Sequence, residues 1–165
     1  MLLTKIFLNE LEMEAASTRK MLAIVPDDKY DWRPHPKSMT IRALATHVAE
    51  IPGWISSVMQ NDVLDFANTP YNPKVINNTS QLLAHFDECV AAGKEVLVDA
   101  NESKLNNRWI MKSGDDVFMD LSKAEAIRHS LSQHIHHRAQ LGVFLRLLNI
   151  PIPGVYGPSA DEMGM

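Results

Sequence analysis

Residues 122–148 read SKAEAIRHSLSQHIHHRAQLGVFLRLL, and their pattern predicts one long helix. Ser122 precedes Glu125 by three residues, which is the spacing of a capping box at a helix N-terminus. The residues of one helical face then recur at alternating steps of three and four: Ile127, Leu131, His134, Arg138, Leu141, Leu145 and Leu148. Pro151 disfavours helical angles at the residue before it, so the helix is expected to end near Asn149.

One turn of this predicted helix is unusually polar for the core of a helical bundle. Gln133, His137 and Gln140 share a stripe, and Gln133 lies four residues before His137, so these two side chains stand side by side. Two donors at that spacing can bind one metal ion. They cannot complete its coordination shell, so a third ligand must come from another helix.

The bulk composition is typical of one globular domain spanning residues 1–165. Apolar residues make up 45% of the chain and charged residues 22%, which argues against disorder. The net charge of −4 gives no basic surface for nucleic acid, so no nucleic-acid partner is expected. The apolar runs are too short to cross a bilayer, acidic residues begin too early for a signal peptide, and the single cysteine suits a reducing compartment. We therefore expect a cytoplasmic protein without a membrane partner.

The rest of the chain predicts three further helices. They cover residues 2–25, a segment that begins near Thr40 and runs past Val58, and residues 80–100. Pro52 should kink the second helix. The long connection 61–78 is expected to cross the end of the bundle, and residues 105–121 look like two extended pieces around a turn. The fold class is therefore expected to be all-α, an antiparallel four-helix bundle with a small extended hairpin before the last helix.

The candidate metal site combines His47 of the second predicted helix with Gln133 and His137 of the fourth. Neutral imidazoles and an amide oxygen would bind the ion and leave a position open for water or a thiol, whose pKa the metal would lower. The hairpin and the C-terminal tail are expected to wall the mouth of this site. The competing interpretation is a polar core layer without metal, in which hydrogen bonds satisfy the histidines.

Three other side chains have predicted environments. Arg138 lies on the apolar face and should have a carboxylate partner or an interface role, with Glu10 and Glu14 as candidates. Cys89 is expected to be a buried structural thiol instead of a nucleophile. His85 is expected to be solvated.

Two segments carry a family resemblance: HHRAQLGVFLRLLNIPIPGVYGPSADE (136–162) and DWRPHPKSMTIRALATHVAEIPGW (31–54). They resemble the DinB-like family, also called the YfiT-like metal-dependent hydrolases. The resemblance implies an up-down-down-up four-helix bundle, commonly dimeric, with zinc or nickel on three histidines. Those positions correspond to His47, Gln133 and His137, and a histidine follows Gln133 directly as His134. Three outcomes are open: Gln133 supplies an oxygen, His134 is recruited by a helix distortion, or metal affinity is lost.

Characterised relatives include thiol S-transferases, in which the metal is thought to activate a low-molecular-weight thiol. By resemblance, the chain is expected to be a metal-dependent enzyme of the thiol S-transferase or hydrolase type, acting on a small-molecule substrate as a homodimer. The alternative is a non-catalytic dimeric stress-response bundle with a degenerate metal site, which the glutamine at position 133 motivates.

Overall fold

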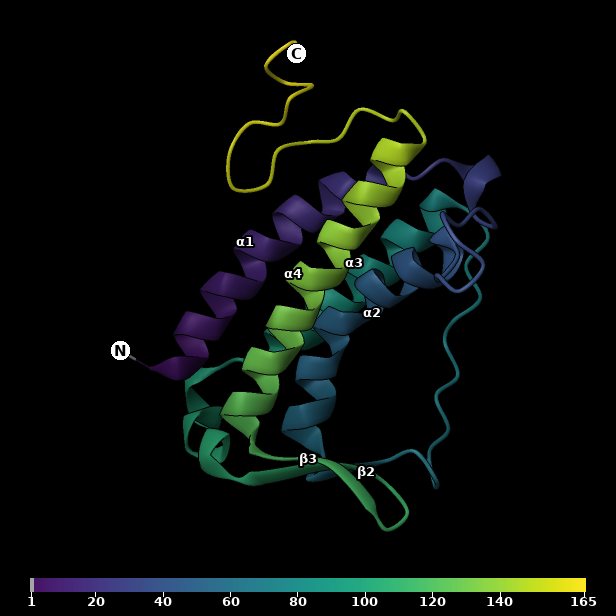
Figure 1. Ribbon diagram of the computed structural model, residues 1–165. Coiled ribbons are helices and arrows are strands. Elements are labelled where there is room, and N and C mark those ends of the chain that lie inside the picture. The colour runs from purple at the N-terminus through teal and green to yellow at the C-terminus, as the bar shows by residue number, and fades with distance from the viewer. Residues whose placement is uncertain (1) are drawn as a thin grey trace.

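Four long α-helices packed side by side dominate the computed structural model, which describes residues 2–165 (Figure 1). They are α1 (Leu3–Ala23), α2 (Ile41–Gln60), α3 (Thr79–Val96) and α4 (Lys123–Leu147), with short 3-10 segments η1 (Asp27–Lys29) and η2 (Asp99–Asn106) after α1 and α3. α1 and α4 lead away from the end of the molecule that carries the strands, whereas α2 and α3 lead toward it (Figure 1). The prediction of a mostly helical chain is confirmed.

A small three-stranded sheet closes one end of the helices. The predicted hairpin is present as β2 (Arg108–Ser113) and β3 (Asp116–Ser122), antiparallel around Gly114, whose φ of +60° favours glycine. Strand β1 (Val63–Asp65) was not predicted, and it pairs with β2 in parallel, with Val63 opposite Ile110. The predicted fold class, all-α with one small hairpin, was therefore incomplete, because the chain also forms a third strand. Three residues are too few to show an alternating pattern, and the partner of β1 lies more than 40 residues further along the chain.

The N-terminus of α4 forms as its sequence predicts. Ser122 Oγ accepts from the Glu125 backbone N–H at 3.3 Å, and the Glu125 carboxylate accepts from the Ser122 N–H at 2.8 Å, which completes the capping box. Ser122 is also the last residue of β3, so the strand passes into the helix without a loop. The buried face of α4 contains the predicted residues Ile127, Leu131, His134, Arg138, Leu141 and Leu145.

Helices α2 and α3 run in the same direction and pack very closely. Pro52 lies inside α2, which bends along its length (Figure 1), in line with the predicted kink. A Cβ atom on Gly93 of α3 would lie 2.6 Å from the Pro52 carbonyl oxygen. Because both helices point toward the sheet, the connection 61–78 must return along the length of the molecule to reach the start of α3 (Figure 1).

Gly93→Ala should therefore lower the free energy of unfolding by about 1–3 kcal/mol, because backbone of α2 must move to admit the methyl group. Gly142→Ala on α4 is the matched control. Its Cβ would meet only the flexible end of Met21 at 3.4 Å, so the higher helix propensity of alanine should make the change neutral or stabilising by up to about 1 kcal/mol. Urea unfolding of both variants measures the difference. Equal stability of the two would contradict the close approach at Gly93.

Arg138 makes a buried ion pair that joins α4 to α1. Its Nη1 lies 2.6 Å from Glu14 Oε2, and the two side chains are 2% and 5% exposed. The prediction of a carboxylate partner is confirmed with Glu14, whereas Glu10 pairs with Arg128. The C-terminal tail reaches the same place, because the Tyr156 hydroxyl bonds to both Arg138 and Glu14.

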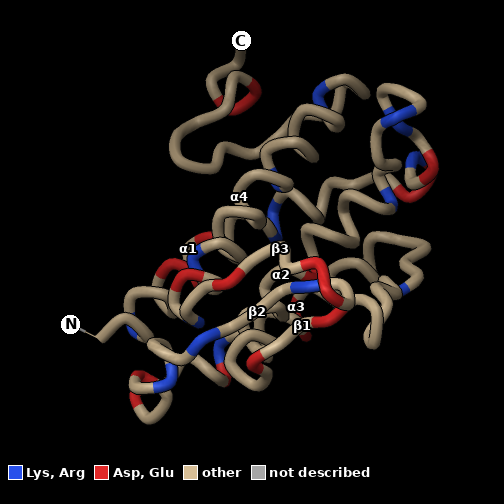
Figure 2. The backbone as a smooth tube through the Cα atoms, turned by 60° about the horizontal axis from the view of Figure 1, so that its bottom comes forward, with Lys and Arg blue, Asp and Glu red and all other residues tan. Residues whose placement is uncertain are grey.

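Charged residues of both signs occur together on the outside of the molecule. Figure 2 shows Lys and Arg interspersed with Asp and Glu along the helices, the strands and the turns. Among residues 2–165, no helix is both long enough and apolar enough to cross a membrane.

Candidate metal centre

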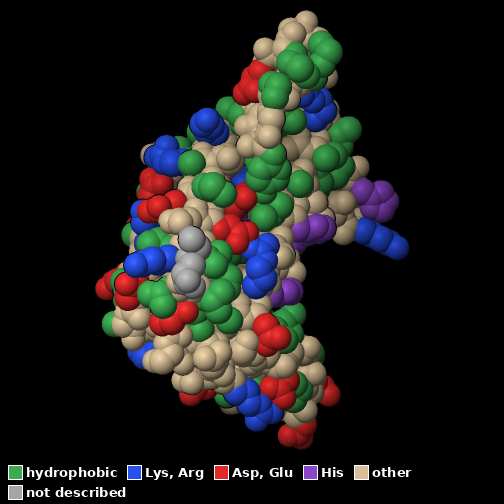
Figure 3. All heavy atoms as spheres, turned by 90° about the vertical axis from the view of Figure 1, so that its left-hand side faces the viewer, with side chains coloured by type: hydrophobic (Ala, Val, Ile, Leu, Met, Phe, Trp, Pro, Cys, Tyr) green, Lys and Arg blue, Asp and Glu red, His purple; other side chains and the backbone are tan. Residues whose placement is uncertain are grey.

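The structure brings His47 of α2 and His137 of α4 into direct contact. Their ring centroids are 4.6 Å apart, and the planes meet edge to face at 76°. Trp54, two turns after His47 on α2, also packs against the His47 ring, with the ring centroids 5.3 Å apart. Both histidines are half-buried. In Figure 3 the histidine side chains gather along one edge of the molecule beside a hollow.

Hydrogen bonds determine which ring nitrogen of each histidine remains free. His47 Nδ1 lies 2.9 Å from the Glu50 carboxylate, and His137 Nδ1 lies 3.0 Å from the Gln140 amide oxygen. Both partners are acceptors, so each Nδ1 carries the proton and donates it. The Nε2 lone pairs of both rings are then available to a metal ion, and the Nδ1 contacts are the orienting bonds that histidine ligands of metals usually make.

The protonation state of His137 suits a metal ligand. Burial lowers its pKa, and the neighbouring rings of His47 and His136 lower it further, while the bond to Gln140 acts in the opposite direction. The imidazole is therefore neutral at pH 7, which is the form that binds metal. The Tyr71 hydroxyl also donates to Glu50 Oε1, the same oxygen that His47 contacts, and the Glu50 side chain is only 12% exposed.

Gln133 lies one helical turn before His137, and its side chain contacts His129, a residue without a predicted role. Its amide nitrogen is 3.4 Å from His129 Nε2, which leaves its carbonyl oxygen as the possible metal donor. His129, Gln133 and His137 follow each other at steps of four, a signal that was visible in the sequence. Between residues 2 and 165, no three His, Cys, Asp or Glu side chains group closely enough to hold a metal ion.

His134 takes a different direction from His137. It is 1% exposed, its ring lies 6.1 Å from that of Phe86 on α3, and neither ring nitrogen has a hydrogen-bond partner within the described chain. Burial and then the charge of Arg138 lower its pKa to about 3, so it is neutral. α4 is a continuous α-helix here, so the structure contains no distortion that would turn His134 toward His47.

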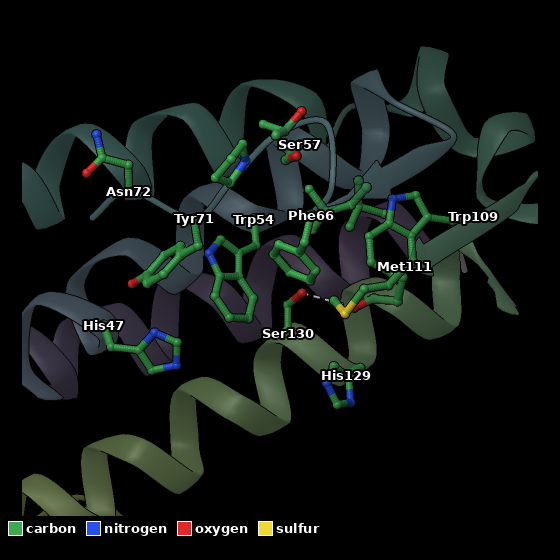
Figure 4. Close-up of a pocket in the computed structure, with 15 residues that line it drawn as sticks. His47, Trp54, Ser57, Phe66, Tyr71, Asn72, Trp109, Met111, His129 and Ser130 are labelled. Carbon is green, nitrogen blue, oxygen red and sulfur yellow. Dashed lines mark hydrogen bonds between the residues drawn. The ribbon is translucent and has the colours of Figure 1, made fainter. Parts of the chain in front are cut away.

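A cavity of about 540 Å³ adjoins His47 and runs toward the sheet (Figure 4). Its walls come from α2, β1 with the connection after it, β2 and α4. The lining residues are His47, Trp54, Ser57, Val58, Leu64, Phe66, Thr69, Pro70, Tyr71, Asn72, Trp109, Met111, Ala126, His129 and Ser130. The hairpin therefore forms a wall, as expected, through β2. The tail was expected to do so as well, and that was wrong: this lining contains no tail residue, because Tyr156 packs over the Glu14–Arg138 pair instead.

Cys89 and His85 form a separate pair on α3, one turn apart. The thiol lies 3.9 Å from the His85 ring and is partly buried against Gly53 of α2. Burial, followed by the charges of Glu50 and Glu88, raises the pKa of Cys89 to about 11. The expectation of a solvated His85 was wrong, because its side chain is only 14% exposed between α2 and α3.

Cys89 should accordingly react slowly with alkylating reagents. A pKa near 11 leaves about one thiol in a thousand ionised at pH 8, so iodoacetamide should modify Cys89 roughly a hundredfold more slowly than free cysteine. The rate should keep rising up to about pH 11, because the thiolate is the reacting form. Mass spectrometry after timed exposure measures the rate. A plateau below pH 9 would contradict this environment for the thiol.

Comparison with known proteins identifies the family of the chain. The chain is 22% identical over 156 residues to the uncharacterized protein YrdA of Bacillus subtilis, covering 94% of this chain and 89% of that one. A DinB-like crystal structure from Bacillus cereus superposes with a TM-score of 0.69 at 21% identity, over 91% of this chain and 95% of that one. The DinB-like protein YjoA of Bacillus subtilis gives 0.67 at 15% identity, over 90% and 96%. The sequence profile of the DinB family matches residues 1–164, and the protein therefore belongs to the DinB family.

Proposed function

We propose that the protein is a metal-dependent enzyme of the thiol S-transferase or hydrolase type, which holds one zinc or nickel ion through His47, His137 and the Gln133 carbonyl oxygen. The observation that carries this proposal is the pair of touching imidazoles whose Nδ1 atoms are both engaged by acceptors. The Nε2 atoms of the two adjacent rings are then the nitrogen donors left for one metal ion. When bound, the metal would lower the pKa of a water or low-molecular-weight thiol in its open position.

The chain's own residues prepare this site before any ion binds. Glu50 and Gln140 hold the two imidazole rings and fix their tautomers, and the Tyr71 hydroxyl restrains Glu50 in turn. The adjoining cavity gives a small-molecule substrate a place beside the open position. The directions of the four helices support the up-down-down-up bundle as part of this proposal. A homodimer is likewise proposed, on the family resemblance alone.

The experiment that tests the metal is elemental analysis of protein purified without a histidine tag. Wild-type protein should contain, or take up on dialysis, close to one equivalent of zinc or nickel, and His47→Ala should lose it. Loss of the ion with retained circular dichroism would separate the effect on the site from an effect on folding. A wild-type protein that stays metal-free in excess zinc and excess nickel would overturn the proposal.

A second candidate is a non-catalytic bundle with a degenerate metal site. The contact between the Gln133 amide and His129 favours it, because this amide already has a partner within its own helix. In that case the melting temperature with zinc or nickel should equal that of the apo protein. A metal that binds only the folded state at a hundred times its Kd would instead add about 2.7 kcal/mol to the free energy of unfolding. A clear rise in melting temperature therefore counts against this candidate.

A further inference from the structure

The side chains that line the cavity beside His47 are mostly uncharged, and this limits the kinds of ligand that the cavity can bind. None of its fifteen residues is Lys, Arg, Asp or Glu, so apart from the imidazoles of His47 and His129 no side chain of this lining is available to neutralise a charged ligand. Burial of an unpaired charge in such a place is strongly unfavourable. The volume of about 540 Å³ lies within the range usual for small-molecule sites. Phosphorylated, carboxylated and cationic compounds are therefore poorly matched to it.

Aromatic rings from three different elements enclose the cavity. Trp54 comes from α2, Phe66 from the connection after β1, and Trp109 from β2 (Figure 4). Met111 follows Trp109 by two residues on β2 and adds a polarizable thioether to the same wall. Rings and a thioether in this arrangement give large contact area to a flat apolar group.

Polar atoms are few in the lining beside its rings, and one of them, Trp109 Nε1, is buried without a hydrogen-bond partner in the described chain. The Ser130 hydroxyl already donates its proton to the Ala126 carbonyl oxygen at 3.0 Å, so it can only accept from a ligand (Figure 4). Thr69 and Asn72 belong to the connection 61–78, and both line the cavity although they are exposed to solvent. His47 marks the end of the cavity that adjoins the candidate metal centre.

We infer that this cavity binds an uncharged, largely apolar small molecule with an aromatic or similarly flat group, one end of which lies beside His47. The inference rests on the proposed function in taking this molecule as the substrate of the metal centre. It goes further in naming the substrate's chemical class. The rings hold the flat group between α2 and β2, and the lack of Lys, Arg, Asp and Glu in the lining disfavours charged analogues.

Two dyes that differ by one sulfonate test this class directly. N-phenyl-1-naphthylamine is uncharged, and 1-anilinonaphthalene-8-sulfonate carries the same rings with an anionic group. Fluorescence titration of metal-stripped protein should give a Kd for the neutral dye at least about tenfold lower than that for the sulfonate, because the sulfonate would lose hydration without gaining a cation. Equal or tighter binding of the sulfonate would overturn the uncharged class.

Strand β1 supplies a matched pair of variants that locate the dye. Leu64 lines the cavity, whereas its neighbour Val63 is 44% exposed and, as adjacent strand residues do, points to the opposite face. Leu64→Arg should weaken binding of the neutral dye by roughly tenfold or more, and Val63→Arg should leave it within about twofold. Met111→Trp, which fills the cavity without charge, gives a second test if Leu64→Arg does not fold. Unchanged binding in both lining variants would place the dye elsewhere and overturn the inference.

The metal measurement is separate from the dye measurement, so the two proposals fail independently. Metal uptake without binding of the neutral dye would overturn the substrate class and leave the metal centre standing. Dye binding that responds to Leu64→Arg in a protein that takes up no metal would support the cavity's selectivity and count against the proposed enzyme.

Discussion

Replacing Arg138 with methionine is expected to lower the free energy of unfolding by about 3–5 kcal/mol, the largest stability effect of any single substitution considered for this protein. The cause is the carboxylate left behind. Glu14 is 5% exposed on α1, and Arg138 is the charge that lies 2.6 Å from it in the structure. Without the guanidinium, Glu14 must take up a proton, draw in water or separate α1 from α4. Each of these costs free energy that the ion pair avoids.

Two controls show that burial is the cause. Arg128→Met removes the ion pair with Glu10, which joins the same two helices, but its side chains are 43% and 25% exposed. That loss should cost less than about 1 kcal/mol. The double variant Arg138→Met with Glu14→Met removes both buried charges together and should regain most of the stability lost in the single variant. Urea unfolding of the four proteins measures these differences. A double variant no more stable than Arg138→Met would mean that lost packing, and not the stranded charge, dominates.

His137→Ala is expected to have the largest effect on metal binding, with a loss of zinc affinity greater than about a hundredfold. Removal of a residue that only orients a histidine ligand typically costs 10–100-fold, and removal of the ligand itself should cost more. Only His47 and the weaker amide oxygen of Gln133 would remain. Glu50→Gln should fall in between, with a loss of about tenfold or more, because the amide can still contact His47 Nδ1 but no longer as a charged acceptor.

His136→Ala is the matched control for that series. It is the neighbour of His137 on α4, is exposed, and makes its own contact with Gln140. Its loss should change zinc affinity by less than about threefold. Isothermal titration with zinc, supported by melting temperatures with and without the ion, measures all four proteins. Equal affinities of His137→Ala and His136→Ala would show that histidine-rich surface, and not a defined centre, takes up the metal.

Local signals in the sequence were sufficient to predict helix α4 and its contact with α2. The capping box at Ser122 starts the helix where the spacing predicts, and the three-and-four pattern identifies its buried face. The pairing of His47 with His137 also follows from pattern, because each lies on a stripe that faces another helix. The same reasoning anticipated a carboxylate for Arg138, and the structure selects Glu14 over Glu10.

What sequence reasoning missed depends on contacts between distant segments. β1 is recognisable only beside β2, whose backbone supplies its hydrogen bonds. The tail was assigned to the wrong side of the molecule, since nothing in its composition shows that the Tyr156 hydroxyl will meet Glu14, 142 positions earlier. Glu50 is a different case. It follows His47 by three residues, so its role as the orienting partner could have been read from helix spacing.

Because residues 61–78 return along the molecule, one segment forms part of the cavity wall while other elements carry the proposed metal ligands. The proposed metal ligands lie on α2 and α4, whereas Phe66, Tyr71 and their neighbours in the cavity wall belong to a segment that carries none of them. Substitutions in this segment, other than at Tyr71, whose hydroxyl restrains Glu50, can reshape the cavity while the histidines keep their positions. A lineage with this arrangement can therefore acquire new ligand preferences by drift in one connecting segment, without rebuilding the proposed metal centre.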